Sequence, residues 1–487
     1  MAEAKFVSGS TMRHIVIMSA TSAVGISALF LVDLLDLFFL SLLGEEELAA
    51  AVGYAGTISF FTTSVGIGLL IAAGALVSRA IGAKDVEGAR RLFVNNTVLA
   101  IAIAIVVAAL VYYFIPDLLT LMGAKGRTHE LAVSYLEILI PSLPLICLGM
   151  MFGGALRALG DAKTSMNSTL LGGLVNAVFD PIFIFALSMG IEGAAVASVM
   201  ARFTVMAYAL HGIVIKHKLY TKFNWPHFVE DLRPIFAIAG PAIFTNIATP
   251  VGNAFVTREM AQFGDGYVAG WAIVGRLIPV AFGMIFALSG AIGPIIGQNF
   301  GAERFDRVSK TFNDALKFAL YYVMAMSLII YFLIDAIILG FDAKGDSASL
   351  IQFFGHFIAV TFFFSGALFV ANASFNNLGK PKYSMFFNVG KATVGTVPFV
   401  IVGAQLWGAY GVLIGQAVGT FVFALFAVIT AKRLVFKLES RHAVQTNSES
   451  EVISRSTSSQ AGFSSAQSMM ACQTEEEDCE GATRTNK

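Results

Sequence analysis

Twelve stretches of about 20 or more mostly apolar residues follow one another along the chain. Each is long enough to cross the hydrocarbon core of a bilayer as an α-helix, which takes about 20 residues. Because backbone groups in lipid must be hydrogen-bonded internally, so many spans predict an all-α membrane protein with twelve transmembrane helices. The stretches occupy residues 15–42, 49–78, 94–115, 132–156, 165–188, 192–215, 233–258, 268–297, 313–340, 350–375, 384–405 and 409–431.

The composition agrees with this assignment and excludes several classes of protein. Hydrophobic residues make up 56% and charged residues 13% of the chain, whereas soluble domains carry about 25% charged residues. Lys and Arg together number 32, as do Asp and Glu, and this balance argues against nucleic acid as a partner. No nucleotide-binding loop, zinc-protease motif or serine-hydrolase motif is present, so we expect neither an enzyme nor a cofactor.

Cationic side chains predict how the spans are oriented. With twelve spans, one side of the membrane receives 22 Lys and Arg residues close to the spans, and the loops on the other side receive 4. Cytoplasmic loops carry the excess of such residues. We therefore expect a multi-pass protein of the cell inner or plasma membrane with both termini in the cytoplasm.

The two halves of the chain repeat each other. Gly82 and Gly301 stand 219 residues apart in similar loops, and Gly160 and Gly379 show the same separation. Each repeat has six spans, so the pseudo-two-fold axis runs along the membrane normal, and the two lobes are expected to enclose a substrate cavity at their seam. The predicted parts are a cytoplasmic N-terminus (1–14), an N-terminal lobe (15–215), a linker (216–232), a C-terminal lobe (233–432) and a polar disordered tail (433–487).

Carboxylates occur inside the predicted spans of the N-terminal half. Asp33 and Asp36 lie three apart in the first span, and Asn176 and Asp180 lie four apart in the fifth. An ionised group at mid-bilayer costs about 2.5–3.5 kcal/mol, so such residues are candidates for function. The positions equivalent to Asp36 and Asp180 in the second half carry no acid.

Two chemical interpretations remain open for these acids. Carboxylates shielded from water bind a proton more readily, and together with the Asn176 amide they also offer the oxygen ligands that Na⁺ accepts. A possible Na⁺ site would use Asp36, Asn176 and Asp180, with Asp33 as a supporting partner. Alternatively, the acids form buried ion pairs with Arg202 or Lys391, which also lie within spans.

Several segments resemble the multidrug and toxic compound extrusion (MATE) family, in particular its DinF-like branch. The resemblance covers about residues 10–435 and rests on Asp36-Leu-Phe-Phe-Leu-Ser-Leu-Leu-Gly44, Arg79-Ala-Ile-Gly-Ala, Leu156-Arg-Ala-Leu-Gly160 and Asn176-Ala-Val-Phe-Asp180-Pro181. It implies coupling acids at Asp36 and Asp180 with Asn176, and a hydroxyl in the sixth helix at Ser198. The chain departs from the family in lacking a proline early in the first helix, near Ala20 and Thr21.

The resemblance implies a secondary active exporter that expels organic cations or amphipathic drug-like compounds in exchange for H⁺ or Na⁺. The protein would act as a monomer in the lipid bilayer. One alternative is a flippase for lipid-linked oligosaccharides or lipids, which would need a strongly cationic cavity. A second alternative is a membrane receptor or enzyme that transports nothing.

Overall fold

The described part of the protein is built from helices. The computed structural model describes residues 4–43 and 46–482, apart from the side chains at 33, 34, 37, 41, 46, 49 and 443–482, and no β-strand occurs within those ranges. The N-terminal half contains η1 (Lys5–Val7), α1 (Thr11–Ser41), α2 (Glu46–Gly82), α3 (Val86–Tyr113), α4 (Ile115–Leu121), α5 (Gly126–Leu139), η2 (Ile140–Ser142), α6 (Leu143–Ala158), α7 (Ala162–Pro181), η3 (Ile182–Ala186), α8 (Gly190–His211) and η4 (Gly212–Lys216).

The C-terminal half repeats the long helices and confirms the twelve predicted spans. It contains α9 (Trp225–Ala261), α10 (Asp265–Gly301), α11 (Phe305–Gly340), α12 (Asp346–Phe353), η5 (Phe354–Ile358), η6 (Ala359–Thr361), α13 (Phe362–Asn377), α14 (Pro381–Ala392) and α15 (Val397–Ala482). Eleven segments of the described residues are long and apolar enough to span a membrane. The last, Pro381–His442, holds two of the predicted spans, separated by a kink at Trp407 and Gly408.

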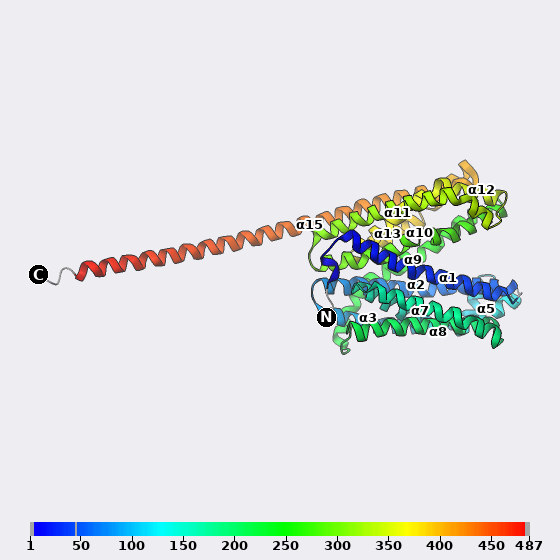
Figure 1. The fold of residues 1–487 in the computed structure, drawn as a ribbon, viewed down its shortest axis with the longest axis horizontal. Helices are drawn as coiled ribbons and strands as arrows, with labels where there is room; N and C mark the ends of the chain where they lie inside the picture. The colour runs from blue at the N-terminus through cyan, green and yellow to red at the C-terminus, as the bar shows by residue number, and fades with distance from the viewer. Residues whose placement is uncertain (1–3, 44–45, 483–487) are drawn as a thin grey trace. The chain divides into compact units, whose positions relative to one another are not determined.

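The two halves meet along a seam that reflects their repeat. Helix α1 packs on α10 and α2 packs on α9, while α2 and α10 contact each other (Figure 1). Helices α9 and α10 repeat α1 and α2, so the first two contacts are equivalents of each other. In the third contact a helix meets its own counterpart, as happens where a two-fold axis passes between them. The structure thus confirms two lobes related by a pseudo-two-fold axis.

The crossing of α2 and α10 depends on two glycines. A Cβ atom on Gly82 would clash with the carbonyl of Gln298, and one on Gly301 would clash with the carbonyl of Arg79. These contacts are equivalent, since each residue stands 219 positions from its counterpart. Small residues let helix backbones approach this closely in a membrane protein, so Gly82 and Gly301 fix the crossing point.

Two side chains next to this crossing join the halves in equivalent ways. Arg79 donates from Nε to the Asn377 carbonyl at 2.8 Å and from Nη2 to the Asn376 carbonyl. Gln298 donates from Nε2 to the Ala158 carbonyl, also at 2.8 Å. Each donor therefore caps a carbonyl-rich helix end in the opposite half. We call this end of the molecule, with loops 83–85, 159–161, 302–304 and 378–380, the basic end.

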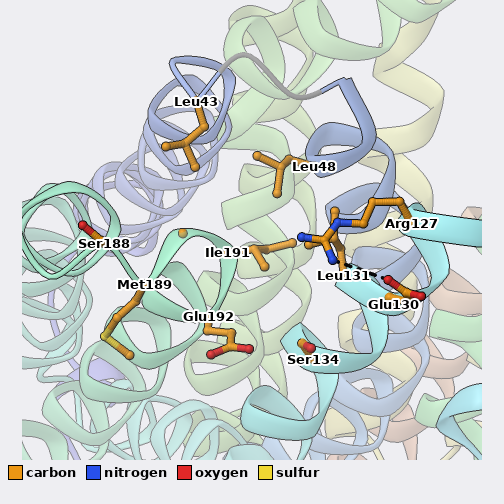
Figure 2. A pocket seen from close by; sticks show the side chains of 11 residues that line it. Leu43, Leu48, Arg127, Glu130, Leu131, Ser134, Ser188, Met189, Ile191 and Glu192 are labelled. Atoms are coloured by element: carbon orange, nitrogen blue, oxygen red, sulfur yellow. Dashed lines mark hydrogen bonds and ion pairs between the residues drawn. The ribbon is translucent and has the colours of Figure 1, made fainter.

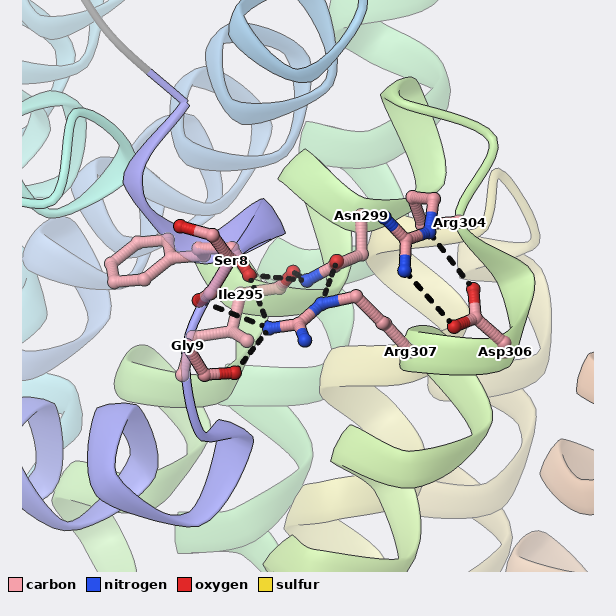
Figure 3. A network of polar contacts seen from close by, with 8 residues as sticks. Ser8, Gly9, Ile295, Asn299, Arg304, Asp306 and Arg307 are labelled. Carbon is pink, nitrogen blue, oxygen red and sulfur yellow. Dashed lines mark hydrogen bonds and ion pairs between the residues drawn. The ribbon is translucent and has the colours of Figure 1, made fainter.

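The chain before α1 adds a further connection at the basic end. The Phe6 carbonyl accepts from Asn299 Nδ2 at 3.1 Å and from Arg307 Nη2 at 3.0 Å. Arg307 also donates to the carbonyls of Ser8 and Gly9, as Figure 3 shows. The segment that leads into α1 is therefore bound to α10 and α11, which belong to the other half.

The C-terminal segment forms a unit of its own, Arg433–Lys487. The predicted polar disordered tail (433–487) lies in this unit and stays a prediction, and the bounds of α15 extend into it as far as Ala482.

Candidate functional site

Two carboxylic acids from different helices meet inside the N-terminal half. Asp36 lies on α1 and Asp180 near the end of α7, and these two helices pack against each other. The two carboxyl groups are close enough to share a hydrogen bond when one of them is protonated. Asp36 Oδ1 and Asp180 Oδ2 are shielded from solvent and have no hydrogen-bond partner. The acid pair therefore has unused capacity to bind a positive charge.

Asn176 completes this arrangement from the same helix as Asp180. Its amide Nδ2 lies 3.5 Å from Asp180 Oδ1, which it can donate to, and its own Oδ1 has no partner. Both side chains are buried, with exposed fractions of 1% for Asn176 and 0% for Asp180. A spacing of four residues puts them on one helix face, so this part of the prediction follows directly from the sequence.

The backbone after Asp180 departs from regular α-helix. Pro181 has no N–H, so the carbonyl four residues earlier receives no bond from it, and α7 passes into the π-helical segment η3. π-Helical turns within helices commonly occur at functional positions.

Two further residues on α8 and one on α5 surround the acids. The Tyr135 hydroxyl lies close to Ser198, and Tyr135 lies near enough to Asp36, Asp180 and Arg202 to interact with their charges. Arg202 follows Ser198 by one helical turn and donates from Nη1 to Ser142 Oγ at 2.8 Å and to the Leu139 carbonyl at 3.2 Å. Tyr135 was not predicted. The signal for it was a hydroxyl inside the apolar stretch 132–156.

The structure thus places Asp36, Asn176, Asp180 and Ser198 in one cluster, which we call the N-lobe cluster and to which Tyr135 belongs. Asp33 lies on α1, one turn before Asp36, but its side chain is outside the described residues. The suggested ion pairs differ from the structure, because neither Arg202 nor Lys391 lies within 4.0 Å of a described carboxylate oxygen. Arg202 instead binds the interrupted backbone between α5 and α6.

The N-lobe cluster suits a small cation. Two carboxylates, an amide oxygen and a hydroxyl are hard oxygen ligands, and the orphaned oxygens of Asp36, Asn176 and Asp180 are available to it. Among the described residues, no group of three His, Cys, Asp or Glu side chains could hold a metal ion.

A cavity of about 220 Å³ lies elsewhere, at the end of the N-terminal half opposite the basic end (Figure 2). Its charged side chains are the ion pair of Arg127 and Glu130, at 3.4 Å, and the exposed Glu192. It contains none of the predicted site residues, although Leu131 in its wall precedes Tyr135 by one turn of α5. The cavity and the N-lobe cluster are therefore separate features that share helices.

A helical bundle of two pseudo-symmetric lobes, with interacting acids buried inside one lobe, defines a membrane transporter. The MatE family model matches residues 22–182 and 241–402, one segment in each half, and the chain belongs to this transporter family.

Known proteins of similar length agree with this assignment. A "FAD transporter" of Shewanella oneidensis is 24% identical over 86% of this chain and 93% of its own length. The "Multidrug export protein MepA" of Staphylococcus aureus is 23% identical over 85% and 91%, respectively. A solved structure described as "MATE in complex with MaL6" superimposes with a TM-score of 0.84 over 90% of this chain and 99% of its own, at 23% identity.

Proposed function

We propose that this protein is a secondary active exporter of the DinF-like branch. It expels organic cations or other amphipathic compounds in exchange for H⁺ or Na⁺, and the entering ion binds at Asp36 and Asp180. The observation that carries this proposal is the contact between these two acids, whose outer oxygens lack partners. Binding one positive charge would neutralise the repulsion between the carboxylates and alter the packing of α1 on α7.

The energetics of such an exchange are sufficient. Inward movement of one positive charge releases about 2.3 kcal/mol per 100 mV of membrane potential. Since every 1.4 kcal/mol corresponds to a factor of about ten, each net inward charge supports a concentration ratio of about 40 for a substrate without net charge. A one-for-one exchange with a monovalent organic cation moves no net charge and is driven by the concentration gradient of the entering ion.

The names of two relatives suggest the substrate class. One exports drugs and another transports FAD, and both kinds of substrate are small molecules with apolar and polar parts. We therefore propose small amphipathic molecules that bind at the seam between the lobes. We further propose that the protein acts as a monomer in the inner or plasma membrane, with the basic end in the cytoplasm, because 22 Lys and Arg residues flank the spans there.

Transport by reconstituted protein tests this function. Proteoliposomes containing wild type, Asp36→Asn or Asp180→Asn would be loaded with a fluorescent cationic dye and given an inward H⁺ gradient, then an inward Na⁺ gradient. Asp342→Asn is the matched control, because Asp342 is exposed and its ion pair is with Lys344, the next residue but one. We expect the wild type and the control to export dye under one of the gradients, and both cluster variants to lose this export.

Two outcomes would contradict the proposal in different ways. Equal transport by wild type and both cluster variants would show that the acids have only a structural role. No dye movement by wild type under either gradient would refute export of this dye class, and labelled lipid-linked sugars would then test the flippase.

A further inference from the structure

A lysine lies deep inside the C-terminal half. Lys391 is the eleventh residue of α14, about 15 Å along the helix from its start, and so about halfway through a hydrocarbon core of about 30 Å. Spacings of three and four residues place it on the same helix face as Phe387 and Asn388, both of which are buried. Lys391 therefore points into the lobe and not toward lipid.

The ammonium group of Lys391 has no counter-charge among the side chains that the structure describes. No described carboxylate oxygen lies within 4.0 Å of it, and Nζ donates no hydrogen bond to any described residue. Arg202 in the other half differs, because its guanidinium has a backbone carbonyl and a hydroxyl as acceptors. The Asn372 and Asn376 amide oxygens on neighbouring α13 are also buried without a partner.

Lys391 lies near the middle of the membrane and remains partly accessible. Lys391 is only partly buried, whereas Asn388, one turn earlier, is buried. An ionised lysine at this depth costs about 2.5–3.5 kcal/mol if nothing compensates it. A group that is costly, accessible and without a protein partner is suited to take its counter-charge from a ligand.

We propose that Lys391 binds the anionic group of an amphipathic substrate, a carboxylate, sulfonate or phosphate, inside the C-terminal lobe. This rests on the proposed function in that the bound molecule is the one exported. The coupling acids lie in the N-terminal lobe and the substrate-binding cation in the C-terminal lobe, so ion and substrate would occupy different halves. The preferred substrates would then be zwitterions or anions with a large apolar part, in preference to simple cations.

Two dyes that differ in a single charge test the role of Lys391. Rhodamine B carries a carboxylate that its ethyl ester lacks, and the two share the same cationic ring system. Binding of each dye to the purified full-length protein in phosphatidylcholine nanodiscs would be measured by fluorescence polarisation. The variants are Lys391→Met, Lys391→Arg and, as the matched control, Lys382→Met, which removes an exposed lysine from the first turn of the same helix.

We expect Lys391→Met to weaken binding of rhodamine B about tenfold, which corresponds to about 1.4 kcal/mol, and to change binding of the ester less than about twofold. Lys391→Arg and Lys382→Met should bind both dyes as the wild type does. Methionine is apolar and similar in length, so loss of folding is not expected. Equal weakening of both dyes, no weakening of either, or failure of arginine to retain binding would overturn the proposal.

Anionic lipid is a second source of the same chemistry. Nanodiscs with added phosphatidylglycerol distinguish the two sources. If this lipid abolishes the wild-type preference for rhodamine B and has no effect on Lys391→Met, the lysine binds lipid headgroups. If the preference persists, it binds soluble substrate. A wild type that binds rhodamine B through Lys391 but exports neither dye would refute the proposed function and leave the lysine site intact. Export of dye by a protein in which Lys391→Met binds both dyes as the wild type does would refute the lysine site and leave the proposed function intact.

Discussion

Arg79 provides the most direct test of how the basic end stays closed. Its Nε and Nη2 donate to the carbonyls of Asn377 and Asn376 across the seam, and its guanidinium lies 5.6 Å from the centre of the Phe300 ring. These contacts join the two halves, so they exist only while the basic end is closed. Arg79→Met keeps the length of the side chain and removes both donors.

The magnitude follows from these contacts. A hydrogen bond from a charged donor contributes about 1.5–3 kcal/mol net, and partial exposure of Arg79 favours the low end for the two bonds together. We take about 2 kcal/mol, which shifts a two-state equilibrium about 30-fold toward the state with the basic end open. Such a shift changes a minor population of a few per cent into about half of the molecules.

Distances between labels on the two halves measure this shift. Lys163 and Lys382 are exposed, occupy equivalent positions 219 residues apart, and lie on the first turns of α7 and α14. Spin labels on cysteines at these positions, in a background without Cys147, Cys472 and Cys479, give the distance distribution by double electron–electron resonance. Arg79→Met should add a longer-distance population that is weak in the parent protein.

The control is Arg304→Met, which removes an exposed arginine whose partner, Asp306, lies two residues later in the first turn of α11 and so in the same half. It should leave the distribution unchanged. The reasoning fails if Arg79→Met gives the same distances as its parent, because the two carbonyl contacts would then not hold the basic end closed.

Three further predictions concern the cluster, its helix and the membrane orientation. Tyr135→Phe removes one hydroxyl contact to Ser198, worth about 1 kcal/mol, and should slow dye exchange in proteoliposomes about fivefold; an unchanged initial rate would show that the contact is not used. Burial would raise the pKa of Asp161, but hydrogen bonds from His217, Lys216 and Thr164 hold this pKa below its usual range. Asp161 also caps α7 by accepting from the Thr164 N–H, so Asp161→Ala should lower the free energy of unfolding by about 1 kcal/mol or more at pH 7, and by less as the pH falls below about 4. Thermal unfolding in detergent at the two pH values measures this loss, and a loss that does not change with pH would show that the ionised carboxylate contributes nothing. A fluorescent protein fused after Lys487 should fold and fluoresce in the cytoplasm of intact cells, whereas a periplasmic phosphatase fused there should be inactive, and the reverse result would overturn the predicted orientation.

Much of the fold was predictable because lipid leaves few alternatives. Apolar length alone located the spans. The predicted boundary between 384–405 and 409–431 lies within one continuous helix, α15, at its kink around Trp407 and Gly408. The repeat was visible at Gly82 and Gly301 because close backbone crossings tolerate no Cβ. The breaks inside helices, such as the π-helical η3, were not predictable, since they depend on how neighbouring helices satisfy the freed carbonyls.

The site was predictable where its residues share a helix. Asn176 and Asp180 lie four apart, so the face they form could be read from the sequence. Their meeting with Asp36, and the contact of Tyr135 with Ser198, depend on packing between helices that no spacing encodes. The described side chains of Asp36 and Asp180 form no ion pair with Arg202 or Lys391, because opposite charges in one membrane need not lie on facing helices.

The repeat also separates what holds the lobes together from what distinguishes them. The seam contacts come in equivalent sets, with Gly82 matched by Gly301 and Arg79 matched by Gln298. Symmetric contacts of this kind stabilise the closed basic end without favouring any ligand. The buried charges are not repeated, since the acid pair is confined to one half and Lys391 to the other. A ligand changes a conformational equilibrium only through groups that interact differently with it in the two states. If the proposed roles hold, this asymmetry lets ion and substrate act from opposite lobes on one shared seam, so that binding of either can favour a different state.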